Sequence, residues 1–65
     1  MSGKSIAERI RSARKALGLS QAKAAKAWGF RKRTLEVWDQ GKQQPAGLYR
    51  AKLERVLRRI EAKGE

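Results

Sequence analysis

Three consecutive cations, Arg31, Lys32 and Arg33, have the types and spacing that most clearly indicate chemistry in this chain. Arg and Lys donate hydrogen bonds to phosphate oxygens and to O6 and N7 of guanine in the major groove of DNA. As a solvated charge run they would be costly, because each cation at an exposed helix start opposes the macrodipole by about 0.3–1 kcal/mol. A polyanion offsets that cost, so DNA contact is the favoured interpretation.

The charge balance of the whole chain favours the same kind of partner. The 65 residues include 17 Lys and Arg but 6 Asp and Glu, which gives a formal net charge of +11 at pH 7. Such a balance favours duplex DNA, with RNA and an anionic membrane surface as alternatives. Basic residues without any acid lie between positions 9 and 35, so one face of the domain is expected to be positive. These basic residues are Arg9, Arg11, Arg14, Lys15, Lys23, Lys26, Arg31, Lys32 and Arg33.

The residue types that the chain lacks argue against catalysis. It contains no His and no Cys, so the commonest general base, a reactive thiolate and the usual zinc ligands are all missing. We therefore expect no enzyme, no metal and no other cofactor. No segment approaches the roughly 18 apolar residues of a membrane-spanning helix, and residues 1–11 do not resemble a signal peptide. The expectation is a cytoplasmic protein with no membrane partner and no small-molecule substrate.

The elements that must position the cations are expected to be helices, since no segment shows the period of two that strands require. Ser5 followed by Glu8 forms a capping-box pattern, and Gly18 ends the helix that starts there. Ser20 caps the second helix, and Pro45 precedes the last one. The whole chain is predicted to form one compact all-α domain of four helices, with a fifth left open. The expected helices cover residues 5–17, 21–28, 32–40 and 46–62.

Apolar residues at helical spacing predict the core. Trp28 and Trp38 could stack on the bases of single-stranded nucleic acid, but both occupy inward positions and are assigned to the core. Phe30 lies between two expected helices and is assigned to the core in preference to contact with a thymine methyl group. The other inward positions are Ile6, Ile10, Ala13, Leu17, Ala24, Ala25, Leu35, Tyr49, Leu53, Val56, Leu57 and Ile60.

Residues 20–40 have the spacing of two helices that cross steeply through a tight turn. Ala25 lies midway along the first of these helices, where only a small side chain fits between crossing backbones. Gly29 supplies the residue with positive φ that the turn needs. Leu35 and Trp38 are expected to anchor the second helix by its inner face, which leaves the opposite face free to enter a DNA groove.

Part of the chain resembles a signature of the helix-turn-helix domains of phage Cro and C1 repressors. The matching positions are residues 17–22 (Leu-Gly-Leu-Ser-Gln-Ala), Ala25, Gly29, residues 38–42 (Trp-Asp-Gln-Gly-Lys) and Pro45. The likeness covers about residues 6–57. The segment Gln-Pro-Ala-Gly at residues 44–47, followed by one long helix, resembles short antitoxin-type autorepressors and the small regulators beside anti-CRISPR genes. The resemblance implies a compact Cro/C1-type fold with its helix-turn-helix motif at about residues 20–40.

The same resemblance implies a role for each matched residue. Base edges are expected to be contacted by Lys32, Arg33, Glu36 and Val37. Phosphates are expected to be contacted by Gln21, Lys23, Arg31, Gln40, Lys42, Gln43 and Gln44. Arg14 and Asp39 match an internal ion pair that ties the first helix to the end of the third.

The chain departs from the family pattern in three places. Arg31 stands where a capping Ser or Thr is usual, and Lys32 and Arg33 replace small polar side chains that read bases. Lys23 stands where an acidic residue is common. Each departure adds positive charge, so the family's typical operator sequence is not carried over.

Family members commonly bind DNA as two-fold dimers, and Val56, Leu57 and Ile60 are expected to pair with a second copy. The prediction is a sequence-specific, double-stranded DNA-binding transcriptional regulator of a phage or mobile element. It is expected to act as a repressor of its own operon, bound as a homodimer to an inverted repeat. The alternative is an antitoxin-like module whose main role is binding a partner protein, although the residues after Glu61 are too few for an inhibitory tail. RNA binding through general basicity is a further alternative.

Overall fold

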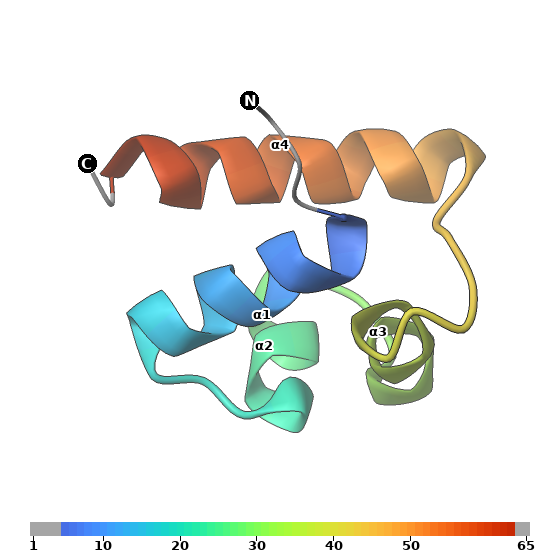
Figure 1. The fold of residues 1–65 in the computed structure, drawn as a ribbon, viewed down its shortest axis with the longest axis horizontal. Coiled ribbons are helices and arrows are strands. Elements are labelled where there is room, and N and C mark those ends of the chain that lie inside the picture. Colours follow the sequence, from blue (N-terminus) through green and yellow to red (C-terminus); the bar gives the residue numbers. More distant parts are fainter. Residues whose placement is uncertain (1–4, 64–65) are drawn as a thin grey trace.

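Four α-helices account for most of residues 5–63, which are the residues that the structure, a computed structural model, describes (Figure 1). They are α1 (Ile6–Leu17), α2 (Gln21–Trp28), α3 (Lys32–Asp39) and α4 (Gly47–Lys63). No strand occurs within this part of the chain, so the all-α prediction is confirmed, and the fifth helix is not found there. The predicted helix ends lie within about one residue of those observed, a difference that fraying alone produces.

Local capping interactions fix where the first two helices begin. Ser5 Oγ accepts a hydrogen bond from the N–H of Glu8 at 3.2 Å, and the Glu8 carboxylate accepts from the N–H of Ser5 at 3.0 Å. The predicted capping box is therefore confirmed. Ser20 caps α2 in the same way, with Oγ accepting from the N–H of Lys23 at 3.2 Å. The turn between them uses Gly18, whose φ of 68° is the left-handed conformation expected for a helix end.

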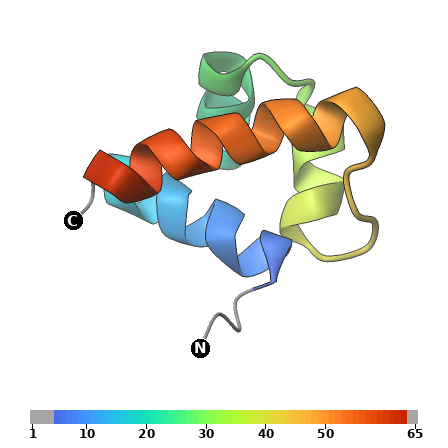
Figure 2. The ribbon, with the colours of Figure 1, turned by 90° about the horizontal axis from the view of Figure 1, so that it is seen from above.

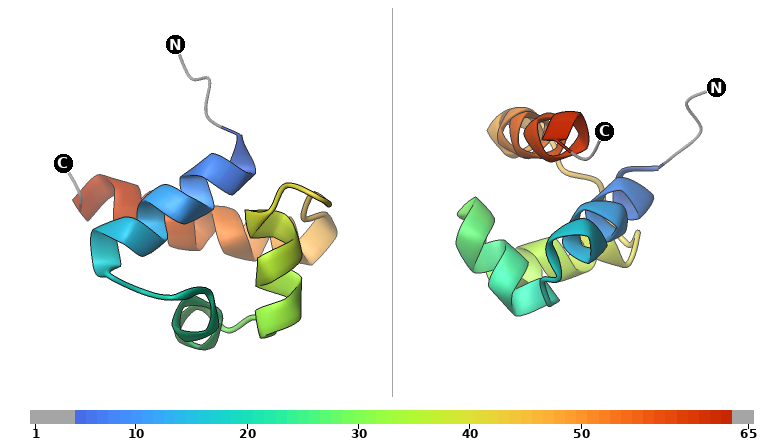
Figure 3. Two further views of the ribbon diagram at one scale, coloured as in Figure 1. Left: turned by 60° about the horizontal axis from the view of Figure 1, so that its bottom comes forward. Right: turned by 90° about the vertical axis from the view of Figure 1, so that its left-hand side faces the viewer.

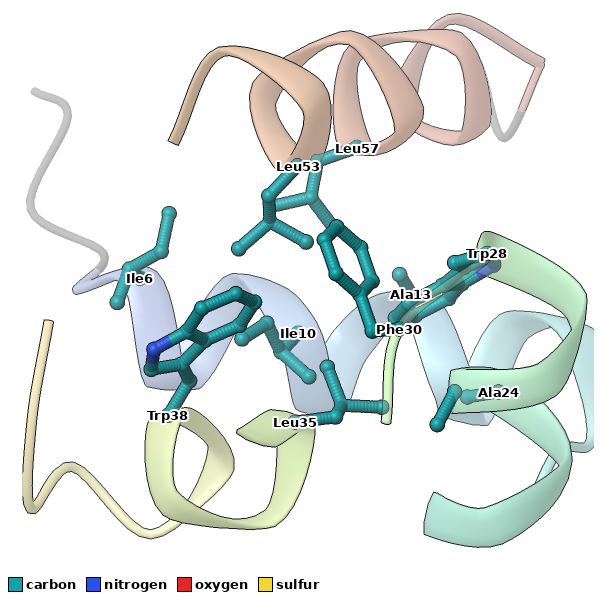
Figure 4. Packing of buried hydrophobic residues seen from close by; sticks show 11 residues of the cluster. Ile6, Ile10, Ala13, Ala24, Trp28, Phe30, Leu35, Trp38, Leu53 and Leu57 are labelled. Atoms are coloured by element: carbon teal, nitrogen blue, oxygen red, sulfur yellow. The ribbon is translucent and has the colours of Figure 1, made fainter. Parts of the chain in front are cut away.

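The core lies between the four helices, each of which contributes buried side chains. α4 runs along one side of α1, and α3 packs against both α1 and α2 (Figures 1 and 2). In Figure 4, Leu53 and Leu57 are directed from α4 toward the ring of Phe30. Trp28, Phe30 and Trp38 are each at most 9% exposed, so their assignment to the core is confirmed. The remaining members of the cluster are Ile6, Ile10, Ala13, Ala24, Ala25 and Leu35.

Two residues predicted to face the core lie at its edge instead. Leu17 is 50% exposed because it is the last residue of α1, and the chain turns away immediately afterwards at Gly18. Tyr49 is 59% exposed because it lies in the first turn of α4, at the margin of the helix bundle. The inner side of its ring still packs on Trp38, with the ring centroids 5.9 Å apart. Helical spacing gives the correct direction for both residues but not the extent of the core.

Arg9 of α1 holds α4 in place through two carboxylates. Its Nη1 donates to both oxygens of Glu54 at 3.0 Å, and its Nε donates to Oε2 of Glu61 at 2.9 Å. The hydrogen bond to Glu61, followed by those to Glu54, raises the pKa of the Arg9 guanidinium despite its partial burial. Arg9 was expected to belong to a positive face, but acids of α4 neutralise its charge. Sequence order alone did not show that α4 returns to α1.

Candidate nucleic-acid interface

The turn between α2 and α3 is tight and is held from three sides. Gly29 has a φ of 83°, and its N–H donates to the carbonyl of Ala25 in α2. The N–H of Phe30 donates to the same carbonyl at 2.8 Å, and the Phe30 ring enters the core. Lys52 of α4 donates from Nζ to the carbonyl of Gly29 at 2.9 Å and lies 5.0 Å above the Phe30 ring. These contacts fix the direction in which α3 leaves the turn.

Sequence analysis did not identify Lys52 as a positioning residue. Its side chain spans from α4 to the end of α2, where a cation favourably meets the negative end of the helix dipole. No local pattern reveals Lys52, because its partner is 23 residues away in the chain.

The two faces of α3 have opposite characters. Leu35 is fully buried and Trp38 is 5% exposed, so these residues anchor the helix as predicted. Arg33 is exposed on the other side, and Lys32 is exposed in the first turn of the helix. Within the part of the chain that the structure describes, neither cation forms an ion pair. The left view of Figure 3 shows α3 beside α2 at the margin of the molecule.

Glu36 and Val37, the other predicted base-reading residues, are half-buried on α3. Each therefore retains surface that a ligand could contact. The outer face of α3 thus combines exposed donors with one carboxylate and one branched apolar side chain. These are the group types that distinguish base pairs in a major groove.

The first turn of α3 lacks a side-chain cap. Arg31 occupies the cap position with φ −75° and ψ 144°, and its side chain makes no capping hydrogen bond. The first N–H groups of a helix have no partner within the helix, so they remain available to an external acceptor. The three exposed cations belong to the same first turn or directly precede it. The combination suits an anionic oxygen such as that of a phosphate.

Asp39 connects α3 to both preceding helices. Its Oδ2 lies 3.2 Å from Nη2 of Arg14 in α1 and also accepts a hydrogen bond from the side-chain amide of Gln21 in α2. Arg14 additionally donates to the carbonyl of Leu19 at 3.3 Å. The predicted ion pair is confirmed, and Asp39, 5% exposed, is satisfied by two partners. Gln21 therefore braces α3 directly, and any phosphate contact would use the rest of its amide group.

Family models, curated proteins and solved structures give no match for this chain. Residues 5–63 contain no helix that is long and apolar enough to cross a membrane. The same residues contain no group of three or more His, Cys, Asp or Glu side chains that could together hold a metal ion. The capability of the site therefore rests on the chemistry of its own side chains.

A cleft of about 230 Å³ lies between the outer face of α3 and the loop that follows it. It brings together residues that sequence analysis assigned to two different roles, base reading and phosphate contact. Thr34 and Trp38 also line it, although neither was predicted to belong to the site. The sequence could have indicated Thr34 as a member of the site, because Thr34 lies one helical turn from both Arg31 and Val37. The lining residues are Arg31, Arg33, Thr34, Val37, Trp38 and Gln43.

The loop after α3 is tied to the end of that helix. The N–H of Gly41 donates to the carbonyl of Trp38 at 3.1 Å, and the N–H of Lys42 donates to the carbonyl of Val37 at 3.1 Å. The predicted phosphate-contacting side chains of this loop remain exposed, as does Lys23 near the start of α2. The exposed loop residues are Gln40, Lys42, Gln43 and Gln44.

The positive residues between positions 9 and 35 divide into paired and unpaired groups. Arg9 and Arg14 are bound by carboxylates, so neither contributes a free charge to the surface. The others form no ion pair among residues 5–63. This second group consists of Arg11, Lys15, Lys23, Lys26, Arg31, Lys32 and Arg33.

The residues expected to pair with a second copy require one correction. Leu57 is fully buried in the core of its own chain, so it has no surface for a partner subunit. Val56 and Ile60 pack against the same core but remain partly exposed. The apolar stripe of α4 serves mainly to cover the other helices. Larger exposed apolar surface lies at the start of α4, where Leu48 is 89% exposed and Tyr49 is 59% exposed.

Proposed function

We propose that this chain is a Cro/C1-type helix-turn-helix domain that binds double-stranded DNA and regulates transcription, acting as a repressor of its own operon. The observation that supports this most strongly is the arrangement of α3. Leu35 and Trp38 bury its inner face, while Arg33 on the outer face and Lys32 in the first turn are both exposed. A helix held in this way can enter a major groove without changing its own packing.

The outer face of α3 supplies groups for base recognition. Arg33 and Lys32 would donate to O6 and N7 of guanine, and Glu36 would accept from the amino group of cytosine. Val37, which lines the cleft beside α3, would contact a thymine methyl group. Each well-formed base contact of this kind contributes about 1–3 kcal/mol of discrimination between base pairs. The preferred sequence should therefore contain G·C pairs where Lys32, Arg33 and Glu36 meet the base edges.

Affinity would come mainly from contacts to the DNA backbone. The uncapped start of α3 offers N–H groups beside Arg31, and the loop offers Lys42 with neighbouring glutamine side chains. Each phosphate that a cation neutralises releases a counterion, so binding should weaken steeply as salt rises. RNA suits this surface less well, because the major groove of an A-form helix is too deep and narrow for side chains to read.

Two copies on an inverted repeat would place two α3 helices about 34 Å apart, one turn of DNA. We retain the homodimer as part of the proposal, with Val56 as its remaining predicted contact, because Leu57 is buried and Ile60 lines a separate groove beside α1. Leu48 and Tyr49 provide additional apolar surface for such a contact. Because these residues lie at the start of α4, close to Trp38, a contact there would also fix the spacing of the α3 helices.

DNase footprinting of the duplex upstream of the gene that encodes this chain tests the proposal. The expected result is two protected segments of related, inverted sequence, with centres about one helical turn apart. Protection should disappear on adding unlabelled duplex of the same sequence but persist with an equal mass of unrelated duplex. Uniform protection, or equal competition by both duplexes, would contradict sequence-specific binding.

A further inference from the structure

An apolar groove lies at the opposite end of the molecule from α3. The C-terminal ends of α1 and α4 come together there, on the left side of Figure 1, with α3 on the right side. The groove has a volume of about 350 Å³, within the range typical of ligand-binding clefts. It is lined by Ala16, Leu17, Arg59, Ile60 and Lys63.

The floor of the groove is apolar and accessible. Leu17 is half exposed although it is a large aliphatic residue, and Ile60 beside it is only partly buried. A single exposed leucine needs no explanation, but here Ala16 extends the apolar surface along α1. The three side chains come from two helices, so the surface is concave rather than a simple stripe. It offers a place for apolar side chains of another molecule.

The rim of the groove carries two cations of α4. Arg59 and Lys63 lie one helical turn apart and form no ion pair among the described residues. Like charges at this spacing destabilise a helix slightly. Arg50 and Arg58, by contrast, lie 3.7 Å and 3.6 Å from carboxylate oxygens of Glu54. Both cations beside the groove are therefore available to an acidic ligand that enters it.

We propose that this groove docks an acidic amphipathic segment of a partner protein, with aliphatic anchors for the floor and carboxylates for the rim. A second copy of this chain fits less well, because a two-fold contact brings the same patch together from both sides. Arg59 and Lys63 would then meet identical cations on a chain of net charge +11. The acid nearest in sequence, Glu61, is bound by Arg9 on another side of α4.

The position of the groove separates it from the DNA interface. No residue of the groove belongs to α2, to α3 or to the loop that follows α3. A partner seated there would leave Lys32 and Arg33 uncovered, so DNA and the acidic segment can bind at the same time. The docking site therefore adds a protein partner to the proposed regulator and does not replace DNA as its ligand.

Fluorescence anisotropy with a labelled synthetic peptide tests this site. The peptide is an amphipathic helix with leucines on one face and glutamates elsewhere, and the control peptide has the same composition in scrambled order. Wild-type protein should bind the first peptide at least about tenfold more tightly than the second. Leu17→Ser should lose about tenfold in affinity, while Leu48→Ser, a matched change at the other end of α4, should have no effect.

Charge is tested with a second matched pair of variants. Arg59→Gln with Lys63→Gln should weaken peptide binding, whereas Arg31→Gln with Lys32→Gln removes the same charge at α3 and should not. Circular dichroism of each variant confirms that the fold is retained, as expected for exposed positions. The proposal also requires that Leu17→Ser weaken peptide binding to the same extent when the protein is saturated with a DNA duplex.

Several outcomes would overturn the proposal. Failure of the amphipathic peptide to bind would show that the groove is not such a site, and equal binding of the scrambled peptide would reduce the effect to net charge. Equal losses from Leu17→Ser and Leu48→Ser would place the contact elsewhere. A wild-type dimer that Leu17→Ser converts to a monomer in sedimentation would assign the groove to a second copy. Binding of a medium-chain fatty acid in place of the peptide would assign it to a lipid carboxylate.

Discussion

Oδ2 of Asp39, the last residue of α3, lies 3.2 Å from Nη2 of Arg14 in α1, and both side chains are largely buried. Gln21 of α2 completes the interaction by donating to the same oxygen. One carboxylate therefore connects three helices at the end of the proposed DNA-reading helix. The interaction lies beside the hydrophobic core. It sets the orientation of α3 and is not what makes this segment helical.

Removing one member of this pair should cost more stability than removing both. Arg14→Ala is expected to lower the free energy of unfolding by about 3 kcal/mol, because it leaves a buried carboxylate with one neutral partner. The double variant Arg14→Ala with Asp39→Ala removes the stranded charge, so it should be less destabilised than the sum of the single changes. Urea unfolding of the wild type and three variants measures the coupling. Strictly additive losses would show that the two charges do not interact.

Stability and DNA binding should change in opposite directions at Arg31. Arg31→Ser introduces a capping hydroxyl at the start of α3, which is expected to raise the free energy of unfolding by about 1 kcal/mol. The same change removes a cation from the proposed phosphate site and should weaken DNA binding several-fold. Thermal unfolding and a gel-shift titration measure the two effects. Ser20→Ala, which removes the existing cap of α2, should lower stability by a similar amount and serves as the control.

Leu35 and Leu17 should respond very differently to truncation although both were predicted to lie in the core. Leu35 is fully buried, so Leu35→Ala is expected to cost about 2–5 kcal/mol through lost contacts and a cavity. Leu17 is half exposed, and Leu17→Ala should change stability by less than about 0.5 kcal/mol. Denaturant midpoints of the two variants compare them directly. Equal costs would mean that α1 is buried along its whole length.

Helix positions could be predicted because their signals are local. Ser5 with Glu8, and Gly18 after the last turn, lie within a few residues of the helix ends that they determine. The same applies to the outward position of Arg33, which lies nearly opposite the buried Leu35 around the same short helix. The ion pair of Arg14 with Asp39 is a long-range contact that was predicted by resemblance.

Features that depend on where α4 lies could not be predicted in this way. Arg9 was assigned to a positive face because its partners, Glu54 and Glu61, are far away in the chain. Leu57 was assigned to a dimer contact because helical spacing does not show which part of a stripe another helix already covers. Lys52 was missed as a support for the turn for the same reason.

The central claim is that α3 reads base pairs, and Arg33→Ala tests it most directly. Affinities are measured at one salt concentration for a duplex selected from a randomised pool and for a scrambled duplex. We expect Arg33→Ala to cost about 1–3 kcal/mol on the selected duplex, and much less on the scrambled one. Arg55→Ala, which removes an exposed cation of α4, should affect both duplexes alike and weakly. Equal losses on both duplexes for Arg33→Ala would contradict base reading by α3.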